Sequence, residues 1–172
     1  MSTYCRFFIQ LTYFPLVVPD FFGRIISNIN WCLGGPMSKV LVFGHKNPDN
    51  DAIMSATMFA ELKNQLHDGN EYIACRLGGM PRESELMLEK CGFKAPQLLD
   101  KIELTGDEEE PVKVILTDHN ECCQSVDGLE NAQIVGIVDH HRIGNFSNPN
   151  PIFFVTLPWG SCSSIVAYLY GA

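Results

Sequence analysis

The chain has 172 residues, of which 46% are apolar and 19% charged, so it can bury a core and wholesale disorder is excluded. Its net charge is −8, and the lack of any block of lysines and arginines argues against a nucleic-acid partner for this chain alone. Its seven cysteines are odd in number and form no CxxC motif, which indicates reduced thiols in a cytoplasmic protein rather than a disulfide framework or a zinc ribbon.

Residues 1–36 differ from the rest of the chain, since they are rich in Phe, Tyr, Ile and Pro and nearly uncharged. Residues 7–18 have about the length of the apolar part of a signal peptide, but only Arg6 offers a charge before them. Pro15, Pro19, Asp20 and Arg24 break the apolar stretch, which falls short of the roughly 20 continuous apolar residues of a membrane span. We expect no membrane contact and an ordered domain that begins at Met37. A weak export signal or a membrane-surface anchor is the alternative.

From Met37 onwards, short apolar runs alternate with helical patterns. The runs predicted to be strands are Lys39–Phe43, Glu71–Leu77, Val112–Thr117, Gln133–Val138 and Ile152–Thr156. Helices are predicted at Ala52–Leu66 and Pro81–Cys91, and a third helix begins near Ser161, with Ser161 or Ser163 as its cap. This alternation predicts an α/β fold, a doubly wound and mainly parallel five-stranded sheet with helices on both faces.

Polar side chains follow three of these strands. They are His45, Asp49 and Asp51 after the first strand, Asp118 after the third, and Asp139, His140 and His141 after the fourth. Because the carboxyl ends of parallel strands meet at one edge of a sheet, we expect these side chains to converge there. Each cluster alone has a plainer explanation, and Asp51 sits where the N-cap of a helix belongs.

Taken together, four carboxylates and three imidazoles at one edge would repel one another and lose hydration, so bound cations are the natural relief. Carboxylate and imidazole ligands without thiolate favour Mn²⁺, Co²⁺ or Fe²⁺ over a structural zinc ion. Six or more ligands suit two ions that share a bridging carboxylate, and such pairs activate water for phosphoryl displacement. The residues therefore predict a two-metal hydrolase.

The motifs GHKNPDNDA, DHNE and VDHHR resemble those of the DHH phosphoesterase superfamily, and most closely those of the family II, manganese-dependent inorganic pyrophosphatases. The stretch LPWGSCSSIV is similar to the segment after that family's fifth strand, and the resemblance runs from about Met37 to the end of the chain. It implies hydrolysis of pyrophosphate to two phosphates by a water that two metal ions activate. It also implies Mn²⁺ or Co²⁺ as the ions, Mg²⁺ with the substrate, and a cytoplasmic homodimer.

The same resemblance implies a role for each polar residue. The metal ligands, for the first and second ion in turn, are His45 with Asp49, and Asp51 with His140. Asp118 would bridge the ions and take part in catalysis, and His141 would face the substrate phosphate. Asp139 would orient an imidazole, while His119 and Asn120 would lie behind the ligands or beside the substrate.

Members of the resembled family carry a further metal-binding Asp after the helix that begins near Ser161, then a C-terminal domain that brings Lys and Arg to the substrate. We therefore expect residues 37–172 to be a metal-binding DHH domain that stops before the substrate-binding domain, and to be weakly active or inactive alone. The alternatives are another DHH phosphoesterase, such as an exonuclease, an exopolyphosphatase or an oligonucleotide or cyclic-dinucleotide phosphodiesterase, or a metal-binding fragment without catalysis.

Overall fold

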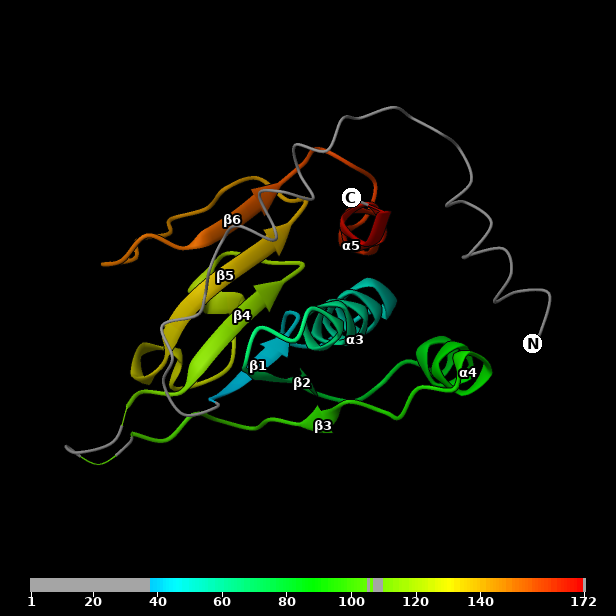
Figure 1. The fold of residues 1–172 in the computed structure, drawn as a ribbon, viewed down its shortest axis with the longest axis horizontal. Helices are drawn as coiled ribbons and strands as arrows, with labels where there is room; N and C mark the ends of the chain where they lie inside the picture. Colours follow the sequence, from blue (N-terminus) through cyan, green and yellow to red (C-terminus); the bar gives the residue numbers. More distant parts are fainter. Residues whose placement is uncertain (1–37, 105, 107–109, 172) are drawn as a thin grey trace.

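The computed structural model describes residues 38–104, 106 and 110–171, so the predicted extension at residues 1–36 and its boundary at Met37 lie outside the described residues. The strands are β1 (Lys39–Phe43), β2 (Glu71–Arg76), β3 (Gln97–Leu98), β4 (Lys113–Thr117), β5 (Gln133–Asp139) and β6 (Phe153–Thr156). They form one sheet in the order β3-β2-β1-β4-β5-β6, and every pairing between neighbours is parallel (Figure 1). The predicted α/β fold with a mainly parallel sheet is confirmed.

The sheet has one strand more than the sequence predicts. The additional strand, β3, has only two residues, Gln97 and Leu98, and both are exposed. Such a short edge strand lacks the apolar run by which a buried strand is recognised in a sequence. The five predicted strands are all present, with ends that differ from the predicted ones by one residue at most.

The α-helices are α3 (Asn50–Gln65), α4 (Arg82–Cys91) and α5 (Cys162–Gly171). Figure 1 shows α3 and α5 beside each other over one face of the sheet, with α4 next to α3. The opposite face is covered by connecting segments that contain the 3-10 helices η2 (Cys122–Gln124) and η3 (Leu129–Asn131). Among the described residues this face carries these short helices rather than the α-helices that a doubly wound sheet predicts.

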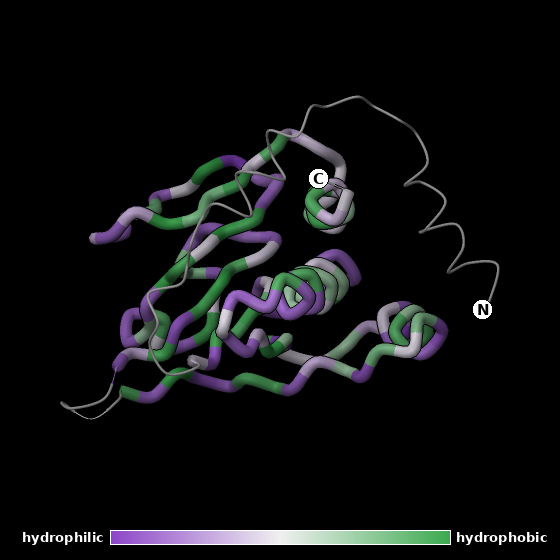
Figure 2. Tube along the Cα trace, in the orientation of Figure 1, coloured by the Kyte–Doolittle hydropathy of each residue, from purple (hydrophilic) through white to green (hydrophobic). Residues whose placement is uncertain are grey.

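The core lies on both faces of the sheet because side chains alternate along each strand. Val40 and Val42 of β1 pack in the cluster that α3 and α5 cover, whereas Phe43 packs in the cluster on the opposite face. Figure 2 shows mainly hydrophobic residues along the central strands. No helix among the described residues is both long enough and apolar enough to cross a membrane.

The N-cap of α3 differs from the prediction. Asp49, not Asp51, caps this helix, and its Oδ1 accepts a hydrogen bond from the backbone N–H of Ala52 at 2.9 Å. The helix begins at Asn50, so Asp51 already lies inside its first turn and not at the N-cap position. Gly44 lets the loop approach this helix, since a Cβ at Gly44 would lie 2.6 Å from that of Ala52.

The ends of the other helices agree with the sequence. Ser161 Oγ accepts a hydrogen bond from the backbone N–H of Ser164 at 3.1 Å, which confirms Ser161 as the capping side chain of α5. Gly92 ends α4 with a left-handed φ of 77°, as the predicted helix stop requires.

The strand order fixes where a ligand can bind. From β1 the chain runs outward to β2 and β3, returns to β4 beside β1, and runs outward again to β5 and β6. The order therefore reverses between β1 and β4, and in such sheets ligands bind outside the carboxyl ends of the strands at the reversal. His45 follows β1 and Asp118 follows β4 at this position.

Candidate metal centre

Asp118 is the centre of the site. It follows β4 with a left-handed φ of 61°, a conformation that Asp tolerates better than most residues. Its backbone N–H donates to the carbonyl of Val138 in β5 at 3.0 Å, so the turn is tied to the neighbouring strand. The residue is only 1% exposed. The fold therefore buries a carboxylate between the ends of β1, β4 and β5.

The two oxygens of Asp118 face two different groups of residues. Oδ2 lies 3.6 Å from Nε2 of His45, and that nitrogen lies 3.8 Å from Oδ1 of Asp49; His45 and Asp49 are the first group. Oδ1 lies 3.1 Å from Nε2 of His140, and that nitrogen lies 3.7 Å from Oδ2 of Asp51; Asp51 and His140 are the second group. Ligand atoms around one octahedral ion lie about 3 to 4 Å apart, because each bond is about 2.1 Å long.

The electrostatics of Asp118 favour a cation. Burial is the main cause that raises the pKa of its carboxyl to about 9, and the negative charges of Asp51, Asp49 and Asp139 raise it further. Asp118 Oδ1 has no hydrogen-bond partner among the described residues, although it is buried. The surrounding donors are carboxylate oxygens and imidazole nitrogens, without thiolate, which is a set that Mn²⁺ and similar ions accept. These residues fit divalent cations on both sides of Asp118.

The two imidazoles are oriented by backbone carbonyls. Nδ1 of His45 lies 2.8 Å from the carbonyl oxygen of Lys46, and Nδ1 of His140 lies 2.9 Å from that of Trp159. A carbonyl only accepts hydrogen bonds, so Nδ1 carries the proton in each ring and Nε2 keeps its lone pair toward Asp118. Both rings thus have the tautomer that a metal ligand needs.

Asp139 holds the turn that carries both histidines after β5. Its Oδ1 accepts hydrogen bonds from the backbone N–H groups of His140 at 2.8 Å and His141 at 3.1 Å, and from Nδ1 of His141 at 2.9 Å. Burial alone would raise the pKa of Asp139, but the hydrogen bonds from Asn120, His141 and the backbone outweigh it and hold this pKa below its usual value. The prediction that Asp139 orients an imidazole is confirmed, and the imidazole is that of His141.

A comparison with known protein families identifies the chain's relatives. The sequence model described as the N-terminal domain of the DHH family matches residues 39–172. The chain belongs to the DHH family. The resemblance that the motifs carry is therefore confirmed at the level of the family.

Curated relatives of this DHH-family chain carry the name "probable manganese-dependent inorganic pyrophosphatase". The protein of Exiguobacterium sp. is 46% identical over 134 residues, and that of Streptococcus mutans is 44% identical over the same length. Each match covers 78% of this chain but 41% of the relative, so the chain spans about two fifths of the length of these relatives. A crystal structure of a Methanococcus jannaschii protein assigned to the family II inorganic pyrophosphatases superposes with a TM-score of 0.64 and 34% identity. That match covers 77% of this chain and 38% of the other.

Two further polar residues of the DHH-family chain, Asn120 and His119, lie next to the ligand candidates and bond to neighbouring residues. Nδ2 of Asn120 donates to Asp139 Oδ2 at 2.6 Å, and its Oδ1 accepts from the backbone N–H of Gly144 at 2.6 Å, so Asn120 fixes the loop after β5. His119 is buried and donates from Nδ1 to the carbonyl of Thr117 at 2.9 Å. Burial lowers the pKa of His119 to about 4, which keeps its ring neutral.

Two sets of three ligand atoms lie within 4.8 Å of one another: His45 with Asp49 and Asp118, and Asp118 with His140 and His141. Asp51 joins neither set, and its carboxylate contacts the start of α5. The sequence prediction did not include this contact. The sequence feature that points to this contact is the run of small polar residues in GSCSSIV, where Ser163 is a candidate helix cap.

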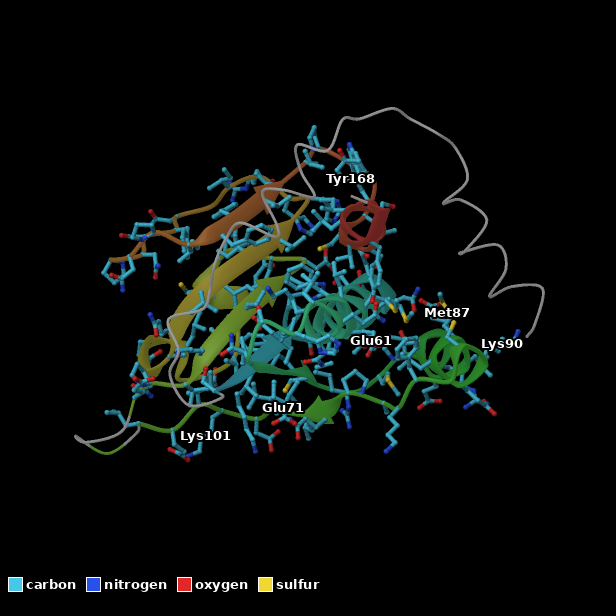
Figure 3. The ribbon with its side chains drawn as sticks, in the orientation of Figure 1. Glu61, Glu71, Met87, Lys90, Lys101 and Tyr168 are labelled. Atoms are coloured by element: carbon cyan, nitrogen blue, oxygen red, sulfur yellow. The ribbon has the colours of Figure 1, made fainter. Side chains whose placement is uncertain are left out.

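The segment before Asp51 is supported from α4. Ser84 Oγ donates to Asn50 Oδ1 at 2.9 Å, and Asn50 Nδ2 lies 3.4 Å from the sulfur of Met87, which Figure 3 labels on α4. Asn50 stands between the ligand candidates Asp49 and Asp51. The start of α3, which carries both aspartates, is thereby held by α4.

Proposed function

We propose that this chain is the metal-binding part of an enzyme that hydrolyses inorganic pyrophosphate to two phosphates with the help of two divalent cations. The observation that carries the proposal is the position of Asp118, whose two oxygens face His45 and His140 separately. The names of the relatives support manganese as the metal and pyrophosphate as the substrate. Co²⁺ as the alternative metal and Mg²⁺ with the substrate stay predictions.

Each ligand candidate has a chemical role in this proposal. Asp49, Asp51 and Asp118 supply negative charge, and His45 and His140 present Nε2 lone pairs to the same space. When bound, such cations lower the pKa of water and offset the charge that grows on phosphate oxygens.

His141 is placed to act on the substrate side. Its side chain is 51% exposed, and Asp139 holds Nδ1, so Nε2 remains for another partner. With a proton on Nε2, the ring would donate a hydrogen bond to a phosphate oxygen. This is the role that the motif resemblance implies for His141.

The remaining expectations are also part of the proposal. Because this chain has a net charge of −8, we expect the cations and a further basic segment to neutralise an anionic substrate. The match covers 41% of the length of the Exiguobacterium relative, which is consistent with such a segment. Residues 37–172 would then form one domain beside a basic second domain. The homodimer and the cytoplasmic location stay predictions.

The decisive experiment measures phosphate release from pyrophosphate and from a dinucleotide, with Mn²⁺, Co²⁺ or Mg²⁺. It compares this chain with a chimera in which residues 38–171 precede the part of the Exiguobacterium relative that lies beyond the match. We expect the chimera to cleave pyrophosphate, its Asp118→Asn variant to be inactive, and the chain alone to be weakly active or inactive. If the chimera cleaves the dinucleotide and spares pyrophosphate, the substrate assignment is wrong.

A further inference from the structure

The carboxylate of Asp51 is held by the N-terminus of α5, far away in the sequence. Oδ2 accepts a hydrogen bond from the backbone N–H of Cys162 at 2.7 Å, across 111 residues. Oδ1 accepts two hydrogen bonds from Ser163, one from its backbone N–H at 2.8 Å and one from its hydroxyl at 2.5 Å. Three donors from one helix start therefore converge on a single ligand candidate.

The carboxylate of Asp51 can still accept a further ligand beside these three hydrogen bonds. A carboxylate oxygen accepts about two hydrogen bonds, so the group offers about four sites. Oδ1 accepts the two bonds from Ser163, whereas Oδ2 accepts one bond, from Cys162, among the residues that the structure describes. The oxygen with a free site, Oδ2, is the one that lies 3.7 Å from Nε2 of His140.

The hydroxyl of Ser163 is not needed to cap α5. Ser161 already caps α5 through the N–H of Ser164, and Asp51 accepts the N–H groups of Cys162 and Ser163. These bonds satisfy the first backbone donors of α5 without the hydroxyl. The hydroxyl bond to Asp51 Oδ1 therefore adds orientation of the carboxylate rather than a helix cap.

The start of α5 is itself rigidly placed. Cys162 is fully buried, and its Sγ lies 3.1 Å from the carbonyl oxygen of Val138 in β5. Trp159, three residues earlier, supplies the carbonyl that orients His140. Residues 159–163 thus control both members of the second group, Asp51 and His140.

We propose that Ser163 is a positioning residue for the second cation. By holding Oδ1 of Asp51, its hydroxyl orients the carboxylate so that Oδ2 is the oxygen beside His140. This inference rests on the two-cation site of the proposed function, but it does not depend on pyrophosphate as the substrate.

The test is a Mn²⁺ titration of the chain, followed by the electron paramagnetic resonance signal of free Mn²⁺. Ser163→Ala should weaken one of the two ions by roughly 10- to 100-fold, as loss of a group that orients a ligand typically does, and leave the other ion within about twofold. Ser163→Thr keeps a hydroxyl and should restore the wild-type affinity. Ser164→Ala removes the neighbouring exposed hydroxyl, which bonds Ser161, and should change neither ion.

Two arms separate this role from a purely structural one. In an Asp51→Asn background, Ser163→Ala should have no further effect on Mn²⁺, because the hydroxyl acts through that carboxylate. If Ser163→Ala does not fold by circular dichroism, Ser163→Cys keeps the side-chain volume with a weaker donor and should weaken the same ion.

Unchanged binding of both ions by folded Ser163→Ala, equal weakening of both, or failure of Ser163→Thr to restore binding would overturn the inference. Failure of the proposed function looks different. A chimera that binds two Mn²⁺ ions, shows the Ser163 effect and does not cleave pyrophosphate would refute the substrate and leave the positioning role intact.

Discussion

The two ligand groups around Asp118 are built in different ways. The first group, His45 and Asp49, comes from one loop between β1 and α3, and its two members are four residues apart. The second group, Asp51 and His140, joins α3 to the end of β5, and both members depend on contacts from residues 159–163. A pair from one loop is fixed by local backbone, whereas a pair from two elements is only as well placed as the packing between them.

The largest effect is expected from a substitution of Asp118, because both ligand groups share this residue. Asp118→Asn should weaken both Mn²⁺ ions by more than roughly 100-fold, since loss of a direct ligand exceeds the loss of a group that only orients one. Mn²⁺ titration measures this, and Asp100→Asn, an exposed residue with the same change of charge, is the control. Retention of two tightly bound ions by the Asp118→Asn variant would remove Asp118 from the centre of the site.

The same residue should control the pH dependence of stability in metal-free protein. The folded-state pKa of Asp118 is raised to about 9 from an ordinary 3.8, so folded protein binds this proton more tightly than unfolded protein does. Its contribution to stability is complete below pH 3.8 and is lost as pH rises toward 9, by about 4 kcal/mol at pH 7. Urea unfolding in EDTA should show this loss in wild type and a flatter profile in Asp118→Asn; parallel profiles would contradict it.

Removal of one imidazole at a time should weaken the two ions separately. His45→Asn should weaken the ion of the first group by about 100-fold and leave the other within about threefold, and His140→Asn should do the reverse. Isothermal titration with Mn²⁺ resolves the two affinities. An equal loss of both ions in either variant would mean that the two groups do not hold separate ions.

The smallest expected effect tests the packing that holds the second group alone. The rings of Trp159 and Tyr168 meet edge to face with centroids 5.4 Å apart, and Figure 3 labels Tyr168 on α5. Such a pair contributes about 0.5 to 1.5 kcal/mol, so Tyr168→Ala should weaken the second ion about threefold by loosening the carbonyl that orients His140. Tyr168→Phe keeps the ring and should bind like wild type. If Tyr168→Ala affects the first ion equally, the packing serves the whole fold instead.

The parts of the fold that depend on local pattern were predictable from the sequence. Buried parallel strands are continuous apolar runs, so the five longer strands and the convergence of His45, Asp118 and His140 followed from the motifs and from strand order. The two-residue strand β3 carries no such run and was missed.

The parts that depend on distant contacts were not predictable. The prediction that Asp51 caps α3 was wrong by two residues, since Asp49 occupies that position. Asp51 instead accepts hydrogen bonds from the start of α5, a contact across 111 residues that no local spacing encodes. The first group lies in one loop whose polar residues the sequence places after β1, whereas the orientation of the second group required the folded structure.

The central claim, that Asp118 lies between two cations, is tested most directly by anomalous diffraction from crystals of this chain grown with Mn²⁺. We predict two anomalous peaks, about 3.5 to 4 Å apart, one beside His45 and one beside His140, with Asp118 between them. A single peak, or peaks that leave Asp118 without a contact, would contradict it.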